Sequence, residues 1–219
     1  MQRHALQFVI ALAGLSLIQA GCSVLRPQPD RTRFFVLEPV AAADAGAPPT
    51  AHAIALGLGP VTFPGYLDRP QLVRRVSPHQ IAISELDHWA EPVQATFTNV
   101  LQHDLLTRLN VSGISTSPWP AGAPLDYEVQ VDVLHFEATT DGTAELADRW
   151  TVRNSKTKQA LLVRDADVKR LSASATTEGA VAALSETVGA LSQDIADALQ
   201  QLETQRRASG REKPKPPGQ

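Results

Sequence analysis

Hydrophobic residues at three- and four-residue steps predict two long helices in this chain. The first set begins at Trp89 and ends at Leu109, and the second set belongs to a helix from about Thr177 to Thr204. Each set places its apolar side chains on one side of an amphipathic helix. The two sets are Trp89, Val93, Phe97, Val100, Leu101, Leu105 and Leu109, and then Val181, Leu184, Val188, Leu191, Ile195, Leu199 and Leu202.

Residues that favour helix starts precede both sets. Pro92 suits the first turn of the first helix, where its missing N–H costs nothing. Either Asp87 or Glu91 lies close enough to complement the positive end of that helix. Thr176 or Thr177 can cap the second helix.

Elsewhere apolar and β-branched residues alternate with polar or small ones, which predicts strands. Ser77-Pro78-His79 and Asp141-Gly142 are turn sequences that join neighbouring strands into hairpins. In the candidate strand that begins at Tyr127, the alternation ends on either His135 or Phe136. The expected strands cover residues 33–37, 52–58, 72–76, 80–84, 111–115, 127–136, 143–153 and 159–168.

This order of elements, β, β, ββ, α, β, βββ, α, predicts an α+β fold. We expect two layers, with both amphipathic helices packed on one face of a mixed, mostly antiparallel sheet. Residues 33–204 form the single predicted domain, after a tether at 22–32. Residues 205–219 are charged and rich in proline, so we expect a disordered tail there.

The N-terminus has the pattern of a secretory signal over residues 1–21. A short basic start precedes an apolar run that is too short to span a bilayer. Ala20-Gly21-Cys22 is similar to the end of a bacterial lipobox, in which the cysteine carries diacylglyceryl and acyl groups and becomes the first mature residue. An ordinary signal peptide with an incidental cysteine is the alternative. Ser23 follows the cysteine, and by analogy with enterobacterial sorting this predicts the outer membrane.

The charge and the motifs of the sequence argue against several classes of function. The net charge of −3 and the dispersed basic residues argue against nucleic-acid binding. The histidines lack metal-ligand spacing, and nucleotide-binding, nucleophile-elbow and zincin motifs are absent from the sequence. We therefore expect no catalytic residue, no metal and no cofactor apart from the lipid groups on Cys22. Asp87 and His88 beside Glu85 also permit acid–base chemistry, although a helix start rich in capping residues explains them too.

One loop, Val61 to Pro70, carries apolar rings without a periodic face to join. Loops on rigid scaffolds often bind partners, and tyrosine at an interface supplies both area and a hydrogen bond. A simple cover over the sheet edge is the alternative. The candidate partner-contact residues are Phe63, Pro64, Tyr66, Leu67, Asp68 and Arg69.

Together these segments resemble the ABC-type transport auxiliary lipoproteins, the PqiC/YmbA family. The resemblance covers Cys22 to Thr204 and is most specific in GPVTFPGYLDRP, from Gly59, and in the later WAEP. It includes RFFVLEP near the start of the domain. The matching positions are Gly59, Pro60, Val61, Tyr66, Leu67, Asp68, Arg69 and Pro70, with Trp89, Ala90, Glu91 and Pro92.

The resemblance implies a non-enzymatic accessory subunit, anchored by lipid at the periplasmic face of the outer membrane of a Gram-negative bacterium. Its expected partner is an MCE-domain protein of an ABC-type system that moves phospholipids or other hydrophobic molecules across the envelope. Rings occur in the family, so a homo-oligomer is expected. An anchored envelope hydrolase, or a structural lipoprotein of another assembly machine, remains an alternative.

Overall fold

The computed structural model describes residues 29–40 and 53–211, and its strands form one eight-stranded sheet. A 3-10 helix, η2 (Gly65–Leu67), and two α-helices, α2 (Val93–Arg108) and α3 (Thr177–Arg211), accompany the sheet. Their order along the chain is the predicted one. The strands are β1 (Arg33–Phe35), β2 (Ile54–Thr62), β3 (Gln71–Ser77), β4 (Gln80–Trp89), β5 (Val111–Thr116), β6 (Tyr127–Thr139), β7 (Thr143–Asn154) and β8 (Ala160–Leu171).

Contacts within the chain separate residues 1–31 from a unit that begins at Thr32. Of the first unit only residues 29–31 are described, and they form neither helix nor strand. The signal sequence and Cys22 lie outside the described residues, as does most of the tether expected at 22–32. The second unit contains every helix and strand named above.

The longest strand, β6, holds the two halves of the sheet together. On one edge it pairs antiparallel with β7, which pairs antiparallel with β8. On its other edge it pairs in parallel with β2 over its first half and with β3 near its end. β5 then extends β2, and β4 and β1 extend β3. The predicted β3–β4 and β6–β7–β8 hairpins are confirmed, and the parallel pairings join segments that are far apart in the sequence.

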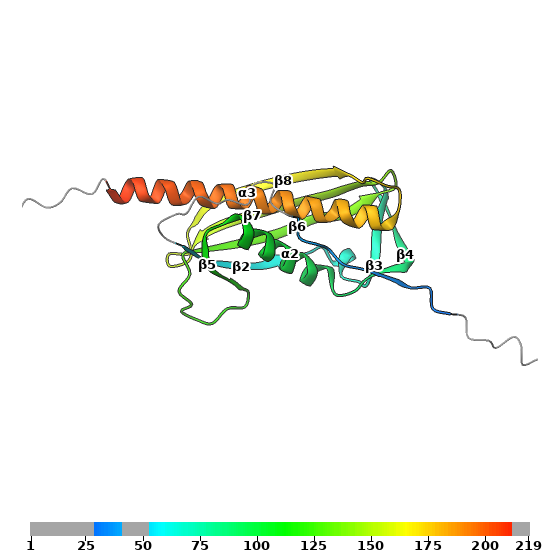
Figure 1. The fold of residues 1–219 in the computed structure, drawn as a ribbon, viewed down its shortest axis with the longest axis horizontal. Helices are drawn as coiled ribbons and strands as arrows, with labels where there is room; N and C mark the ends of the chain where they lie inside the picture. The colour runs from blue at the N-terminus through cyan, green and yellow to red at the C-terminus, as the bar shows by residue number, and fades with distance from the viewer. Residues whose placement is uncertain (1–28, 41–52, 212–219) are drawn as a thin grey trace, which may run out of the picture. The chain divides into compact units, whose positions relative to one another are not determined.

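Both helices pack on one face of this sheet (Figure 1), which confirms the predicted two-layer α+β fold. α2 lies over β2 and β5, and α3 crosses β6, β7 and β8 while also contacting α2. The large side chains of Phe97, Trp150 and Ile195 belong to one hydrophobic core and are fully buried. Burial of such side chains contributes about 1.5–3 kcal/mol each, so the apolar stripes are the main source of helix docking.

The start of the first helix differs from the prediction. Trp89 ends strand β4 instead of opening α2, because it pairs with Phe35 of β1 and its N–H donates to the carbonyl oxygen of Pro70 at 2.6 Å. The helix begins four residues later at Val93, directly after Pro92. Asp87 is likewise a strand residue and does not face the positive end of α2.

The second helix begins as predicted and extends further. Thr176 caps it, since the N–H of Gly179 donates to Thr176 Oγ1 at 3.1 Å. The helix then continues to Arg211 and includes residues 205–211, which the sequence had assigned to the disordered tail. Buried Glu203 accepts a 2.7 Å hydrogen bond from Tyr127 Oη and a 2.9 Å one from Arg206, so this end of the helix is tied to β6. Residues 212–219 of the predicted tail lie outside the described residues.

Candidate partner-contact site on the β2–β3 loop

The β2–β3 loop, residues 63–70, lies beside a break in the strand pairing of β6. The pairing with β2 ends at Asp132, and the pairing with β3 starts only at Ala138. The loop covers this break, because the ring of Phe63 packs edge-on against that of Phe136 at a centroid distance of 6.1 Å. The gap in the sheet therefore fixes where the loop sits.

Two apolar side chains of the loop point into the core. The Phe63 ring also packs edge-on against Phe97 of α2, at 5.2 Å between centroids. Leu67 is only 4 % exposed. Leu67 is buried and Phe63 is partly buried, so the contacts of these two candidate residues within the domain are those of the alternative, a cover over the sheet edge.

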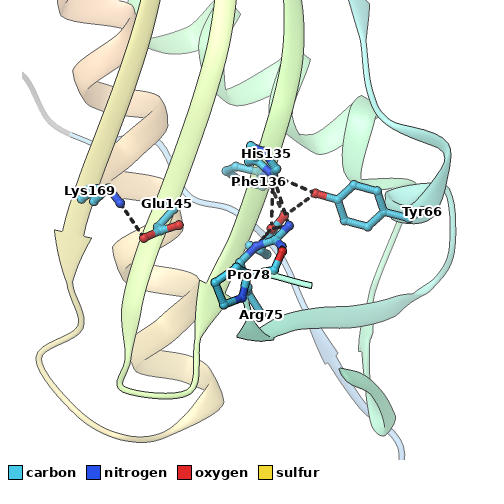
Figure 2. Close-up of polar contacts among 8 residues, drawn as sticks. Tyr66, Arg75, Pro78, His135, Phe136, Glu145 and Lys169 are labelled. Atoms are coloured by element: carbon cyan, nitrogen blue, oxygen red, sulfur yellow. Dashed lines mark hydrogen bonds and ion pairs between the residues drawn. The ribbon is translucent and has the colours of Figure 1, made fainter. Parts of the chain in front are cut away.

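Tyr66 connects the loop to a buried carboxylate (Figure 2). Its hydroxyl donates a 2.6 Å hydrogen bond to Glu137 Oε2, and Arg75 Nε of β3 donates to Glu137 Oε1, also at 2.6 Å. Glu137 is 1 % exposed, and its Oε2 additionally accepts the backbone N–H of Phe136. A buried carboxylate is expensive unless it is paired and hydrogen-bonded, and here both conditions are met.

A bulge in β6 places this carboxylate. The pairing of β6 with β7 shifts register between Val133 and His135, which adds one residue to β6. Beyond the bulge Phe136 takes the core position, so the alternation ends on Phe136 and not on His135. Exposed His135 keeps its Nδ1 3.5 Å from Glu137 Oε1 and 3.2 Å from an Arg75 nitrogen.

The remaining surface of the loop is polar and held in place. Asp68 is exposed and forms no ion pair with any residue in the described ranges. Arg69 is partly exposed and donates from Nε to the carbonyl oxygen of Tyr66 at 2.8 Å, which closes the turn of η2. Pro64 is also partly exposed. Of the six predicted contact residues, Asp68, Pro64 and Arg69 thus offer the surface, with part of the Tyr66 ring beside them.

The hydrogen-bonded residues Tyr66, Glu137 and Arg75 form a clamp that fixes the β2–β3 loop to the sheet. Burial, together with the hydrogen bond to Glu137, raises the pKa of the Tyr66 hydroxyl, so the phenol stays protonated and keeps donating. The Glu137 carboxylate is in turn paired with Arg75. No group of three metal-ligating side chains occurs in the part of the chain that the structure describes. The arrangement can hold a loop rigidly, with both oxygens of the Glu137 carboxylate hydrogen-bonded.

Asp87 and His88, which precede α2, are also engaged in structural contacts. Asp87 accepts hydrogen bonds from Arg33 Nε and from Thr177 Oγ1, each at 2.7 Å. The His88 ring instead packs edge-on against Phe34, at 6.0 Å between centroids. The pair that had suggested acid–base chemistry is therefore divided between two different sets of contacts.

Sequence reasoning found the loop and missed its support, Glu137, Arg75 and His135. The available signal was the loss of strict alternation at His135 and Phe136, followed by Glu137 at a position that strict alternation from Tyr127 would make apolar. A charged residue in such a strand, two positions after a possible bulge, indicates a partner from another element. The sequence alone did not reveal that the partner is Tyr66.

Comparison with known proteins now assigns the family. A family model described as the ABC-type transport auxiliary lipoprotein component matches residues 35–196, most of the chain. The protein is a member of this family. No curated protein sequence matches it. The domain of this auxiliary lipoprotein contains, in the described ranges, no helix long and apolar enough to cross a membrane.

Solved structures share the fold of this auxiliary lipoprotein. Protein XCC0632 of Xanthomonas campestris, from the DUF330 family, superposes with a TM-score of 0.65 at 16 % identity, covering 78 % of this chain and 99 % of its own. An uncharacterised protein superposes with a TM-score of 0.63 at 19 % identity, covering 77 % and 98 %. The PelC dodecamer of Paraburkholderia phytofirmans reaches only 0.39 at 8 % identity, covering 66 % and 86 %, and nothing about assembly follows from it.

Proposed function

We propose that this auxiliary lipoprotein docks an MCE-domain protein of an ABC-type system that moves phospholipids or other hydrophobic molecules across the cell envelope. The observation that carries the proposal is the family match over residues 35–196, within which the loop and its supporting residues lie. The docking role, the MCE partner and the cargo class go beyond the family match and belong to the proposal.

The rigid β2–β3 loop supports the choice of contact surface. Tyr66 is hydrogen-bonded to Glu137, and Leu67 is buried in the core. The exposed residues of the loop therefore keep one arrangement before a partner binds. A preorganised surface binds without a large ordering cost. Asp68 presents a carboxylate that is unpaired within the described residues, which suits a basic group on the partner.

Anchoring at the periplasmic face of the outer membrane completes the proposal. Diacylglyceryl and acyl groups on Cys22 would hold the domain at the bilayer, since each buried methylene contributes about 0.8 kcal/mol. Ser23 after the cysteine is the reason for choosing the outer membrane. No cofactor beyond these lipid groups is part of the proposal, and neither is a catalytic step.

The test is co-purification of the tagged full-length protein from membranes, with MCE-domain proteins identified by mass spectrometry. The decisive variant is Asp68→Lys, which reverses an exposed charge and leaves the Tyr66–Glu137 contact in place. Asp167→Lys is the matched control, because Asp167 is another exposed aspartate, on β8. We expect the wild type and the control to recover an MCE protein, and Asp68→Lys to recover about tenfold less.

Two results would count against the proposal in different ways. Equal recovery by Asp68→Lys removes the loop from the contact surface while leaving docking intact. Recovery of no MCE-domain protein by the wild type rejects the docking function itself.

A further inference from the structure

A groove of about 610 Å³ lies between the segment after β1 and the first turns of α3. Its walls are mainly apolar, and two of its side chains, Phe34 and Val36, are 65 % and 45 % exposed. An open apolar groove beside exposed aromatic and aliphatic residues is typical of a docking site. The lining residues are Phe34, Phe35, Val36, Glu38, Pro39, Val40, Glu178, Val181, Ala182, Ser185 and Glu186.

Three carboxylates surround this apolar surface. Glu38, Glu178 and Glu186 are exposed and form no ion pair with any described residue, and no lysine or arginine lines the groove. Glu178 and Glu186 lie eight positions apart on α3, with Ala182 midway between them. These three helix residues therefore share one side of α3. The groove therefore offers an apolar floor with a negative rim, which suits an occupant that is both apolar and basic.

We propose that the groove binds the C-terminal segment of a second copy of this chain, Arg211 to Pro217. Its sequence, REKPKPP, combines three basic residues and three prolines. Proline favours the polyproline II conformation, whose period of three residues places Pro214 and Pro217 on one side. Segments of this kind dock into aromatic-lined grooves, and flanking basic residues pair with acidic ones there.

The occupant must come from another copy, because a chain cannot reach its own groove. Arg211 lies 25 residues beyond Glu186 on the same helix, a distance of about 37 Å. Lys215 follows four residues later and extends at most about 14 Å from Arg211. Figure 1 shows the C-terminal end of α3 projecting beyond the strands, away from the end where α3 begins.

Such a contact is heterologous, because the groove of one copy receives a different part of the next. Repetition of a heterologous contact generates either a closed ring or an open filament. Self-association of the full-length protein is therefore the property that tests the proposal.

The experiment is a charge exchange, measured as the mass of the full-length protein in detergent by sedimentation velocity over a concentration series. The groove variant is Glu38→Lys with Glu186→Lys, and the segment variant is Lys213→Glu with Lys215→Glu. We expect each pair alone to raise the dissociation constant of self-association about tenfold or more, since two attractive contacts become repulsive. The chain that carries all four substitutions should regain association close to that of the wild type.

The matched control is Glu91→Lys with Asp167→Lys, which changes the net charge as the groove variant does at exposed positions outside the groove. It should associate like the wild type. Thermal unfolding of each variant by circular dichroism checks that the surface changes leave the fold intact.

Any of the following outcomes would overturn the proposal. The wild type is monomeric at all concentrations, neither charge reversal alters association, or the groove variant dissociates while the segment variant does not. The last outcome assigns the groove to a different occupant, such as a basic segment of another protein. Loss of association in both pairs without recovery in the fourfold chain also rejects direct pairing of the groove with the segment.

Discussion

Thr177 Oγ1 donates a 2.7 Å hydrogen bond to Asp87 Oδ2, although the two residues lie 90 positions apart in the sequence. Asp87 also accepts from Arg33 of β1, and Thr177 accepts from Arg74 of β3 at 3.1 Å. One buried carboxylate thereby joins β1, β4 and the start of α3. The end of β4 and the first turn of the long helix are held to each other by this contact.

Thr177→Val should destabilise the protein by about 1.5–3 kcal/mol at pH 7, because it removes a buried hydrogen bond to a charged group. Burial alone would raise the pKa of Asp87, but the hydrogen bonds from Thr177 and Arg33 lower it below its usual value. A lowered carboxyl pKa stabilises the fold above the unfolded-state pKa, and that contribution is lost as the pH falls.

The difference between wild type and Thr177→Val should therefore shrink below about pH 4. Urea unfolding at several pH values measures it. Thr98→Val is the control, since partly exposed Thr98 donates only to a carbonyl of its own helix. A stability difference that does not change with pH would show that the contribution of Thr177 does not depend on the ionisation of Asp87.

The clamp on the β2–β3 loop predicts two unequal losses of stability. Tyr66→Phe removes one donor from Glu137 and should cost about 1–2 kcal/mol in urea unfolding. Arg75→Met leaves the buried carboxylate without its compensating charge and should cost about 3–5 kcal/mol. Equal losses would mean that Arg75, which is partly exposed, does not balance the charge of Glu137.

Local patterns predicted the elements well because each element carries its own period. The stripe on α3 and the alternation in β7 are properties of neighbouring residues, so they predict helix and strand without knowledge of the fold. Trp89 shows the limit of this method. It lies four residues before Val93 and so extends the helical spacing, yet pairing with Phe35 of β1 makes it the last residue of a strand.

The support of the candidate site depends on contacts between distant segments, which periodicity does not contain. Glu137 meets Tyr66 only because β2 and β3 pair with the same edge of β6 and leave a gap between them. The end of α3 is a similar case. Residues 205–211 look like a solvated tail, and the contact between buried Glu203 and Tyr127 extends the helix toward them.

Cys22→Ala should release the protein from the membrane fraction. The reason is that the proposed anchor is the set of acyl chains on this sulfur, and the chain from residue 29 onward supplies no spanning helix in its described ranges. Fractionation followed by intact-mass spectrometry measures both effects, and the wild type should carry the added mass of lipid. Ser23→Ala is the control and should stay lipidated. An unmodified wild-type N-terminus would contradict the anchor.

Asp148→Asn should stabilise the protein at neutral and alkaline pH. Asp148 lies on the helix-facing side of β7, is fully buried, and neither carboxylate oxygen has a hydrogen-bond partner among the described residues. Burial, with the nearby charges of Asp194 and Asp165, raises the pKa of Asp148 to about 7. A raised carboxyl pKa means that ionisation opposes folding, so its cost appears as the pH rises from about 4 and is complete above about 7.

A shift of this size corresponds to about 4 kcal/mol, and the buried amide of the variant offsets part of the gain. We therefore expect Asp148→Asn to exceed the wild type by about 2 kcal/mol at pH 8 and to match it near pH 4. Urea unfolding across this range measures the difference. Asp167→Asn, an exposed aspartate on the neighbouring strand, is the control and should change stability little at any pH. A gain that stays constant from pH 4 to 8 would show that Asp148 is already ionised, and compensated, at the low end of the range.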